Sequence, residues 1–242
     1  MMRERTGPDA REGSAEPALN GRPRALLFDW DNTLVDNWGV ITDAMNAVYD
    51  AFGMARWTVA EAKARIRESM REAFPKTFGE RAKEAGRIFS DHFAAHHLDG
   101  LQEMPGASEL LQGLAATGLH LAVVSNKRGR FLRLEAERLG WTGHFASLIG
   151  AADASVDKPA VEPVEMALAG SGIARGREVW FIGDTDIDML CAVNAGCLPV
   201  LIRREPPGEA EFAAHPPALH LPDCAGLTAR LRALGVLPSA IM

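Results

Sequence analysis

Short apolar runs alternate with amphipathic stretches through most of the second half of this 242-residue chain. Apolar runs bounded by glycine, proline or small polar residues are typical of buried strands, and the stretches between them show the spacing of helices. This alternation predicts a parallel sheet with helices on both faces, the α/β class. The expected strands lie at 24–28, 119–124, 145–150, a run ending at 183, 199–202 and 218–221, and the expected helices at 105–117, 129–139, 162–170, 187–195 and 225–234.

Residues 37–104 differ, because their apolar positions follow only the helical spacing and no strand is obvious. Three apolar faces follow one another at steps of three and four residues. We therefore expect an all-helical segment inserted into the α/β core. The three faces run through 41–52, 59–70 and 78–96.

Composition and charge exclude several classes of function. Hydrophobic residues make up 47% of the chain, which is enough for a substantial core, and the net charge of −6 with no basic block argues against a nucleic-acid partner. No apolar stretch is long enough to span a membrane, so we expect no membrane partner. The three cysteines form no CxxC pair, which favours buried thiols in a reducing compartment and predicts a cytoplasmic protein.

The first 22 residues are rich in Arg, Glu, Gly and Pro and contain no apolar segment. This composition is typical of a disordered tail and unlike a signal peptide. The expected organisation is therefore a disordered tail at 1–22, a core at 23–36 and 105–235, the helical insertion at 37–104, and a second tail at 236–242.

Two acidic clusters follow apolar runs. Asp29 and Asp31 come directly after the first expected strand, and Asp184 and Asp188 follow the run that ends at Gly183. The carboxyl ends of strands are the ligand-binding edge of open α/β sheets. Crowded carboxylates are costly there unless a cation or a proton neutralises them, so the pattern predicts a divalent metal site. Asp184 and Asp188 could converge if a helix begins between them.

Four short motifs occur in order at the ends of the expected strands. They are Asp29-Trp30-Asp31-Asn32-Thr33, Ser125 after an apolar run, Lys158 before a proline, and the segment from Gly183 to Asp188. Together they resemble the motifs of the haloacid dehalogenase-like hydrolases over about residues 24–235. The resemblance implies a Rossmann-like core. The helical insertion resembles the cap of the phosphoglycolate phosphatase and β-phosphoglucomutase branch.

The resemblance also implies roles for the acidic residues and one lysine. Asp29 would be the nucleophile that forms an aspartyl-phosphate. Asp31 would protonate the leaving alkoxide and then deprotonate the attacking water, which requires a protonated carboxyl group in the resting complex. Lys158 would neutralise the phosphoryl group and the Asp29 carboxylate.

A magnesium ion and a phosphate-binding loop complete the implied site. Mg²⁺ would bind Asp29, the Asp31 carbonyl and Asp184. Ser125 and the backbone amides near Asn126 would donate hydrogen bonds to phosphate oxygens. Two further residues would support the site: Asp188 would support the outer shell of the metal or hold Lys158, and Thr33 would support the loop after the first strand.

This chain departs from the family pattern at two positions. Trp30 stands where the family commonly has a smaller apolar residue, and we expect it to serve packing rather than to line the cavity. Asn32 replaces the commoner glycine, and asparagine tolerates the left-handed backbone that the turn needs. Neither change removes a reacting group.

The insertion should select the substrate, because the core supplies only the phosphate chemistry. Its arginines are candidates to meet a second anionic group, although arginines on helices are more often solvated. Its histidines are expected to have surface or packing roles, and Trp38 and Trp57 to pack in the core rather than wall the pocket. The residues in question are Arg56, Arg65, Arg67 and Arg71, and His92, His96 and His97.

The leading hypothesis is a Mg²⁺-dependent phosphatase for a small phosphorylated metabolite, with phosphoglycolate a candidate by resemblance, acting as a monomer or homodimer. A phosphomutase would share the core residues, and a non-catalytic regulatory protein could retain the fold. A dehalogenase is disfavoured because the family's dehalogenases lack the second aspartate. A phosphonate hydrolase would need a lysine in the insertion that forms a Schiff base; Lys63, Lys76 and Lys83 are available, but no feature of the sequence distinguishes one of them. We also expect hinges near 37 and 104–106, over which the insertion closes.

Overall fold

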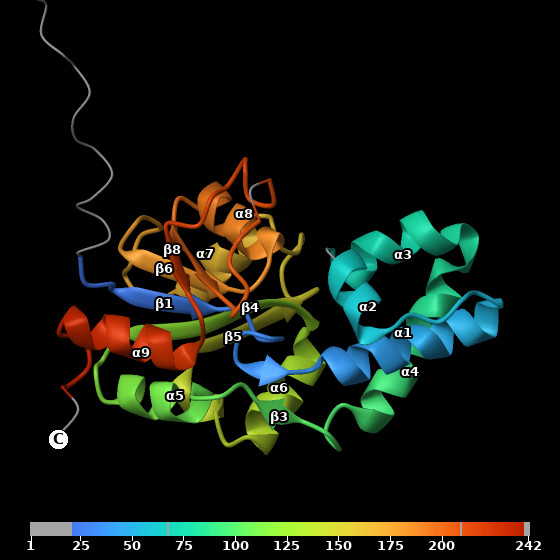
Figure 1. Cartoon of the computed structure of the whole chain (residues 1–242), viewed down its shortest axis with the longest axis horizontal. Helices are drawn as coiled ribbons and strands as arrows, with labels where there is room; N and C mark the ends of the chain where they lie inside the picture. Colours follow the sequence, from blue (N-terminus) through green and yellow to red (C-terminus); the bar gives the residue numbers. More distant parts are fainter. Residues whose placement is uncertain (1–20, 67, 209, 240–242) are drawn as a thin grey trace, which may run out of the picture.

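The computed structural model describes residues 21–66, 68–208 and 210–239, and its centre is a six-stranded parallel sheet (Figure 1). The strand order is β5-β4-β1-β6-β7-β8, so the strand that precedes Asp29 lies inside the sheet. The predicted α/β class is confirmed. The strands are β1 Ala25–Phe28, β4 His120–Arg128, β5 Ser147–Ala151, β6 Val179–Gly183, β7 Leu198–Ile202 and β8 Leu219–Leu221.

Helices cover both faces of this sheet. Helices α5, α6 and α9 pack on one face, and α7 and α8 pack on the other (Figure 1). The predicted strands and helices of this part all exist, with ends that differ by a few residues. The helices are α5 Ala107–Ala115, α6 Gly129–Arg138, α7 Glu162–Leu168, α8 Asp186–Asn194 and α9 Cys224–Ala233.

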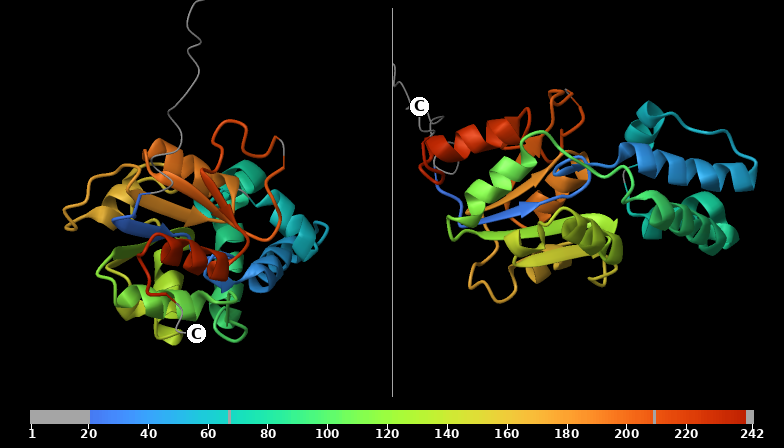
Figure 2. Two further views of the ribbon diagram at one scale, coloured as in Figure 1. Left: turned by 60° about the vertical axis from the view of Figure 1, so that its left-hand side comes forward. Right: turned by 90° about the horizontal axis from the view of Figure 1, so that it is seen from below.

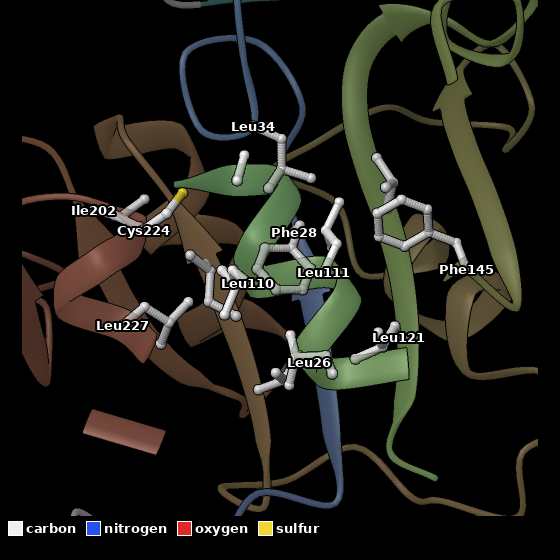
Figure 3. Close-up of a cluster of buried hydrophobic side chains, with 14 of the residues drawn as sticks. Leu26, Phe28, Leu34, Leu110, Leu111, Leu121, Phe145, Ile202, Cys224 and Leu227 are labelled. Atoms are coloured by element: carbon white, nitrogen blue, oxygen red, sulfur yellow. The ribbon is translucent and has the colours of Figure 1, made fainter. Parts of the chain in front are cut away.

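Strand β1 shows why a continuous apolar run gives a central strand. Its side chains alternate between two hydrophobic clusters: Leu26 and Phe28 face α5 and α9, whereas Ala25 and Leu27 face α7 and α8. Figure 3 shows Leu26 and Phe28 packed against Leu110 and Leu111 of α5. Burial on both faces fixes the strand, and therefore the position of the residues that follow it.

The described part of the inserted segment contains four α-helices, which lie beside the sheet rather than on it (Figures 1 and 2). An aromatic cluster that includes Tyr49, Phe74 and Phe78 holds them together. Figure 2 shows two chain segments that join the insertion to the core, one before α1 and one after α4. The helices are α1 Trp38–Phe52, α2 Val59–Arg65, α3 Met70–Phe78 and α4 Ala82–His96, with a short 3₁₀ turn η1 at Gly79–Arg81.

The structure departs from the expected insertion in two ways. The face predicted through 59–70 is broken, because Ile66 is extended and the chain starts a separate helix, α3, at Met70. The segments that join the insertion to the core form a small antiparallel ribbon of β2 (Val35–Asp36) and β3 (Gln102–Glu103), although no strand was expected up to residue 104. Strands of two residues carry too few apolar positions to show a period.

The chain ends of the described part pack on the core. Arg22, which falls within the predicted tail, donates a hydrogen bond from Nε to the carbonyl of Leu234 over 2.8 Å. Leu237 is buried beside α5, so core packing continues past residue 235. The rest of the predicted N-terminal tail, 1–20, and residues 240–242 lie outside the described residues. Within the described ranges, no helix combines the length and apolar character needed to cross a membrane.

Candidate functional site

The carboxyl ends of β1 and β6 bring three carboxylates and a lysine together. Asp29 follows β1, Asp184 follows β6, and Asp188 lies in the first turn of α8. Oxygen atoms of these three aspartates lie within 4.8 Å of one another. Lys158 Nζ donates to Asp29 Oδ1 over 2.6 Å and to Asp188 Oδ1 over 2.7 Å. These four residues are called the Lys158 cluster below.

The backbone around Gly183 allows this approach. Helix α8 begins at Asp186, between Asp184 and Asp188, as their spacing suggested. The Asp188 side chain turns back to accept hydrogen bonds at Oδ2 from Thr185 N (3.0 Å) and Thr185 Oγ1 (2.7 Å). A Cβ atom at Gly183 would overlap the Asp188 side chain, so only glycine leaves room for it.

The Lys158 cluster has one ammonium group for three carboxylates. Burial, together with Asp188 and Asp31, raises the pKa of Asp29 from 3.8 to about 7, against the opposing effect of Lys158. Burial, Asp188 and Asp29 raise the pKa of Asp184 well above its ordinary value. Burial lowers the pKa of Lys158, but Asp188 and Asp29 outweigh this effect, so Lys158 stays charged. The negative charge that is not balanced must be neutralised by protons or by a bound cation.

The donor set fits a hard cation. Three carboxylates with oxygen atoms this close form an all-oxygen site, which is the ligand type that Mg²⁺ prefers. Asp188 already accepts hydrogen bonds on both oxygens from Lys158 and Thr185, which suits an outer-shell position. Thr33 Oγ1 lies 3.5 Å from Asp184 Oδ1 and donates toward it. The residues present therefore fit a divalent metal ion held by Asp29 and Asp184.

The Asp31 side chain contacts a second lysine and an asparagine outside the Lys158 cluster. Its Oδ1 lies 2.7 Å from Lys127 Nζ and accepts a hydrogen bond from Asn37 Nδ2 over 2.8 Å. Burial raises the pKa of Asp31, Lys127 and Asn37 oppose this effect, and Glu135 reinforces it, so the pKa lies above its ordinary value. A raised pKa is what an acid that donates a proton near neutral pH requires.

Lys127 and Glu135 were not anticipated from the sequence. Lys127 is buried, and its Nζ contacts both Glu135 oxygens at 2.9 and 2.8 Å. Lys127 lies just after the strand predicted at 119–124, where a lysine is usually solvated, so it gave no signal. Glu135 did give one, because it lies one turn from Phe131 and Leu132 on the apolar face of α6.

The carboxyl-terminal part of β4 presents Ser125 and Asn126 to the same cavity. Ser125 is buried, and its Oγ accepts a hydrogen bond from Lys127 N over 3.2 Å. The Asn126 side chain pairs with the backbone of Lys158, accepting from its N–H at 3.0 Å and donating to its carbonyl at 3.2 Å. The Asn126 amide group thus fixes the loop that carries Lys158.

The two departures from the family pattern have structural explanations. Trp30 is fully buried, packs edge-on against Trp141 and Phe145, and does not line the cavity, as expected. Its Nε1 donates to Glu135 Oε2 over 2.7 Å. Asn32 has φ of 62°, the left-handed conformation that asparagine tolerates.

A cavity of about 1390 Å³ lies between the insertion and the core. The site residues that line it are Asp29, Asp31, Ser125, Asn126, Lys127, Lys158, Asp184 and Asp188. Arg65 and Arg71 line it, whereas Arg56 lies at a separate hollow and pairs with Asp50. Arg67 lies outside the described residues. Arg71 contacts Asp157 of the core at 2.8 Å.

The tryptophans and histidines of the insertion differ in whether they line the cavity. Trp38 and Trp57 both line the cavity, so the prediction that they do not wall the pocket was wrong. Trp57 also packs against Tyr49, so a tryptophan at the edge of the helical core can serve both purposes. His92 and His96 lie near each other at the outer hollow. The third histidine, His97, is buried and its Nδ1 lies 2.8 Å from Glu135 Oε1, which agrees with a packing role.

The fold and the site define an α/β protein with a buried acidic centre at the carboxyl ends of its central strands, closed on one side by inserted helices. Residues 26–202 match the family model described as haloacid dehalogenase-like hydrolase. The chain therefore belongs to this family, and the prediction of its family and of a hydrolase is confirmed.

Relatives and a solved structure place the chain further. It is 28% identical to a phosphoglycolate phosphatase of Photorhabdus laumondii, over 72% of this chain and 77% of the relative. It is 30% identical to a phosphoglycolate phosphatase of Rhodospirillum rubrum, over 74% and 79%. A predicted phosphoglycolate phosphatase from Haemophilus somnus 129pt superposes with a TM-score of 0.74 at 20% identity, over 86% and 97%, and shares the fold. The names of these relatives support the predicted enzyme class, a phosphatase.

Proposed function

We propose that this chain is a Mg²⁺-dependent phosphatase that hydrolyses a small phosphorylated metabolite through an aspartyl-phosphate on Asp29. The observation that carries the proposal is the contact of Lys158 with Asp29 beside Asp184, at the edge of the cavity. A nucleophile next to a fixed ammonium group and a cation site suits an anionic phosphate ester.

Each reacting residue has a role that balances the reaction. An oxygen of Asp29 attacks phosphorus, the bond from phosphorus to the leaving oxygen breaks, and Asp31 gives its proton to that oxygen. A water molecule then attacks the aspartyl-phosphate and gives a proton to Asp31, which releases inorganic phosphate and restores both carboxyl groups. Asp31 lines the same cavity as Asp29, and its raised pKa supports the acid role.

The remaining residues bind the phosphoryl group and the metal ion. Asp29, the Asp31 carbonyl and Asp184 would hold Mg²⁺, which when bound reduces the repulsion between the nucleophile and the phosphoryl oxygens. Lys158 adds a positive charge beside Asp29. Ser125 and the amides near Asn126 would donate to the phosphoryl oxygens, while Asp188 holds Lys158.

Phosphoglycolate is the first candidate substrate, because the two curated relatives described above carry that name. The cavity of about 1390 Å³ greatly exceeds such a small ester. We therefore expect the insertion to close over the core during turnover, with hinges near 37 and 104–106 at the β2–β3 ribbon. A cytoplasmic location and a monomeric or homodimeric state complete the proposal.

Phosphate release from a panel of phosphorylated metabolites tests this function. We expect turnover with Mg²⁺, none with a chelator, and a loss of at least about 1000-fold in Asp29→Asn, which lacks the nucleophile. Asp43→Asn, an exposed position on α1, is the matched control and should keep full activity. Turnover that survives in Asp29→Asn would contradict the proposal, and a rearranged phosphate ester in place of free phosphate would indicate a mutase.

A further inference from the structure

Glu135 is a fully buried carboxylate that no step of the proposed reaction uses. It accepts hydrogen bonds from four different side chains. Lys127 Nζ contacts both of its oxygens, Trp30 Nε1 lies at 2.7 Å, and Asn37 Nδ2 lies at 3.2 Å. The fourth side chain, His97, lies at 2.8 Å through Nδ1.

Such a group is expensive to keep in a protein interior. A buried ion pair rarely stabilises a fold more than apolar residues of similar volume do. Burial acts to raise the pKa of Glu135, but the charge of Lys127 and the hydrogen bonds from His97, Lys127 and Trp30 outweigh it, so the pKa lies below its ordinary value. Glu135 is therefore a charged acceptor whose cost calls for a function other than stability.

The network ends at the side chain of Asp31. Lys127 Nζ and Asn37 Nδ2 both contact Asp31 Oδ1, at 2.7 and 2.8 Å. Both donors are also bound to Glu135, so each is fixed at a second point. A carboxyl group held by two anchored donors through one oxygen leaves its other oxygen for the substrate side.

The same network reaches both ends of the insertion. Asn37 immediately precedes α1, and His97 immediately follows α4. Glu135 itself belongs to α6 of the core, whose Phe131 packs against Phe93 and His97. Both ends of the insertion are thus bound to one core residue, Glu135. The same residue holds the two donors that contact Asp31.

We propose that Glu135 is a positioning residue for the acid–base step, because it holds Lys127 and Asn37 where they orient the Asp31 carboxyl group. This inference rests on the proposed function and adds the residue that makes Asp31 effective. Trp30 belongs to the same hydrogen-bond network, since its indole N–H donates one of the hydrogen bonds that hold Glu135 in place.

The test compares leaving groups in Glu135→Gln. An alkyl phosphate needs a proton on its leaving oxygen, whereas p-nitrophenyl phosphate has a leaving group that needs none. Because kcat/KM reports the chemistry up to formation of the aspartyl-phosphate, it should fall about 10- to 100-fold for the alkyl ester and stay nearly unchanged for p-nitrophenyl phosphate. The kcat should fall for both esters, because Asp31 also activates the water.

Two further variants serve as a control and as a second test of the role of Glu135. Glu137→Gln, an exposed position on α6, is the matched control and should behave as the parent. Trp30→Phe removes one hydrogen bond to Glu135 but keeps an aromatic ring, and should show the same split at smaller size, so it serves if Glu135→Gln does not fold.

Equal losses of kcat/KM on both esters, or no loss on either, would overturn the positioning role. Different results would overturn the two proposals. If the unchanged protein hydrolysed no phosphate ester, the phosphatase function itself would be overturned. If it were active but the variants lost the same activity on both esters, only the role of Glu135 would be overturned.

Discussion

The site contains two buried lysines, and their surroundings differ in charge balance. Lys158 lies beside three carboxylates and donates hydrogen bonds to two of them, Asp29 and Asp188, but not to Asp184. The Lys158 cluster therefore retains uncompensated negative charge. Lys127 contacts Asp31 and Glu135, and a proton on Asp31, whose pKa is raised, leaves one ammonium group facing one carboxylate. Trp30 and Asn37 are neutral donors to this network. The first arrangement calls for a cation, whereas the second is complete within the protein.

This difference assigns the two lysines to different parts of the reaction. Lys158 contacts Asp29, so it acts where phosphorus is attacked. Lys127 contacts Asp31, so it acts where a proton moves. Variants that remove each ammonium group in turn test this division of roles.

Of the two lysine variants, Lys158→Met should have the larger effect. Loss of the charge beside Asp29 should lower kcat/KM about 100- to 1000-fold on every ester, because the phosphoryl group is attacked in all of them. Lys127→Met should instead lower it mainly for alkyl esters and spare p-nitrophenyl phosphate. Steady-state kinetics with both esters make the comparison, and identical leaving-group patterns in the two variants would contradict the division of roles.

A smaller effect is expected on stability, and it depends on pH. In the metal-free protein the pKa of Asp29 is raised from 3.8 to about 7, and that of Asp184 is raised as well. The folded state then binds more protons than the unfolded state between these values, so the free energy of unfolding falls as the pH rises through about 7. Mg²⁺ should restore it, by about 2.7 kcal/mol at a concentration one hundred times its Kd.

Thermal unfolding with and without Mg²⁺ at about pH 5 and about pH 8 measures this linkage. The stabilisation by Mg²⁺ should be greater at the higher pH, where fewer protons compete for the carboxylates. Asp29→Asn should reduce the Mg²⁺-dependent shift, and Asp43→Asn should leave it unchanged. A shift that is equal at both pH values would argue against a metal site built on these aspartates.

The sequence was informative where burial leaves a clear apolar pattern. The central strand β1 is buried on both faces, so its apolar run marked both the strand and the position of Asp29. The β2–β3 ribbon was missed because each strand has only two residues. The break between α2 and α3 was missed because apolar residues continue across the extended segment at Ile66.

The two lysines show the same limit within the site. Lys158 could be found because it belongs to a motif in a known order, whereas Lys127 follows the strand predicted at 119–124 and looks like an ordinary surface lysine in the sequence. Its burial depends on Glu135, which reaches it from α6. Contacts of this kind arise from tertiary packing. The one sequence feature that indicated them is Glu135, an acidic residue on the apolar face of a predicted helix.

The central claim is that Asp29 carries the phosphoryl group during turnover. Mass spectrometry after rapid acid quench tests it most directly, because it locates a phosphoryl group on a peptide. We predict a phosphorylated peptide that contains Asp29 in the presence of Mg²⁺ and substrate, and none in Asp29→Asn or with a chelator. Phosphate release without a phosphorylated Asp29 peptide at any quench time, or with the group on another residue, would contradict the account.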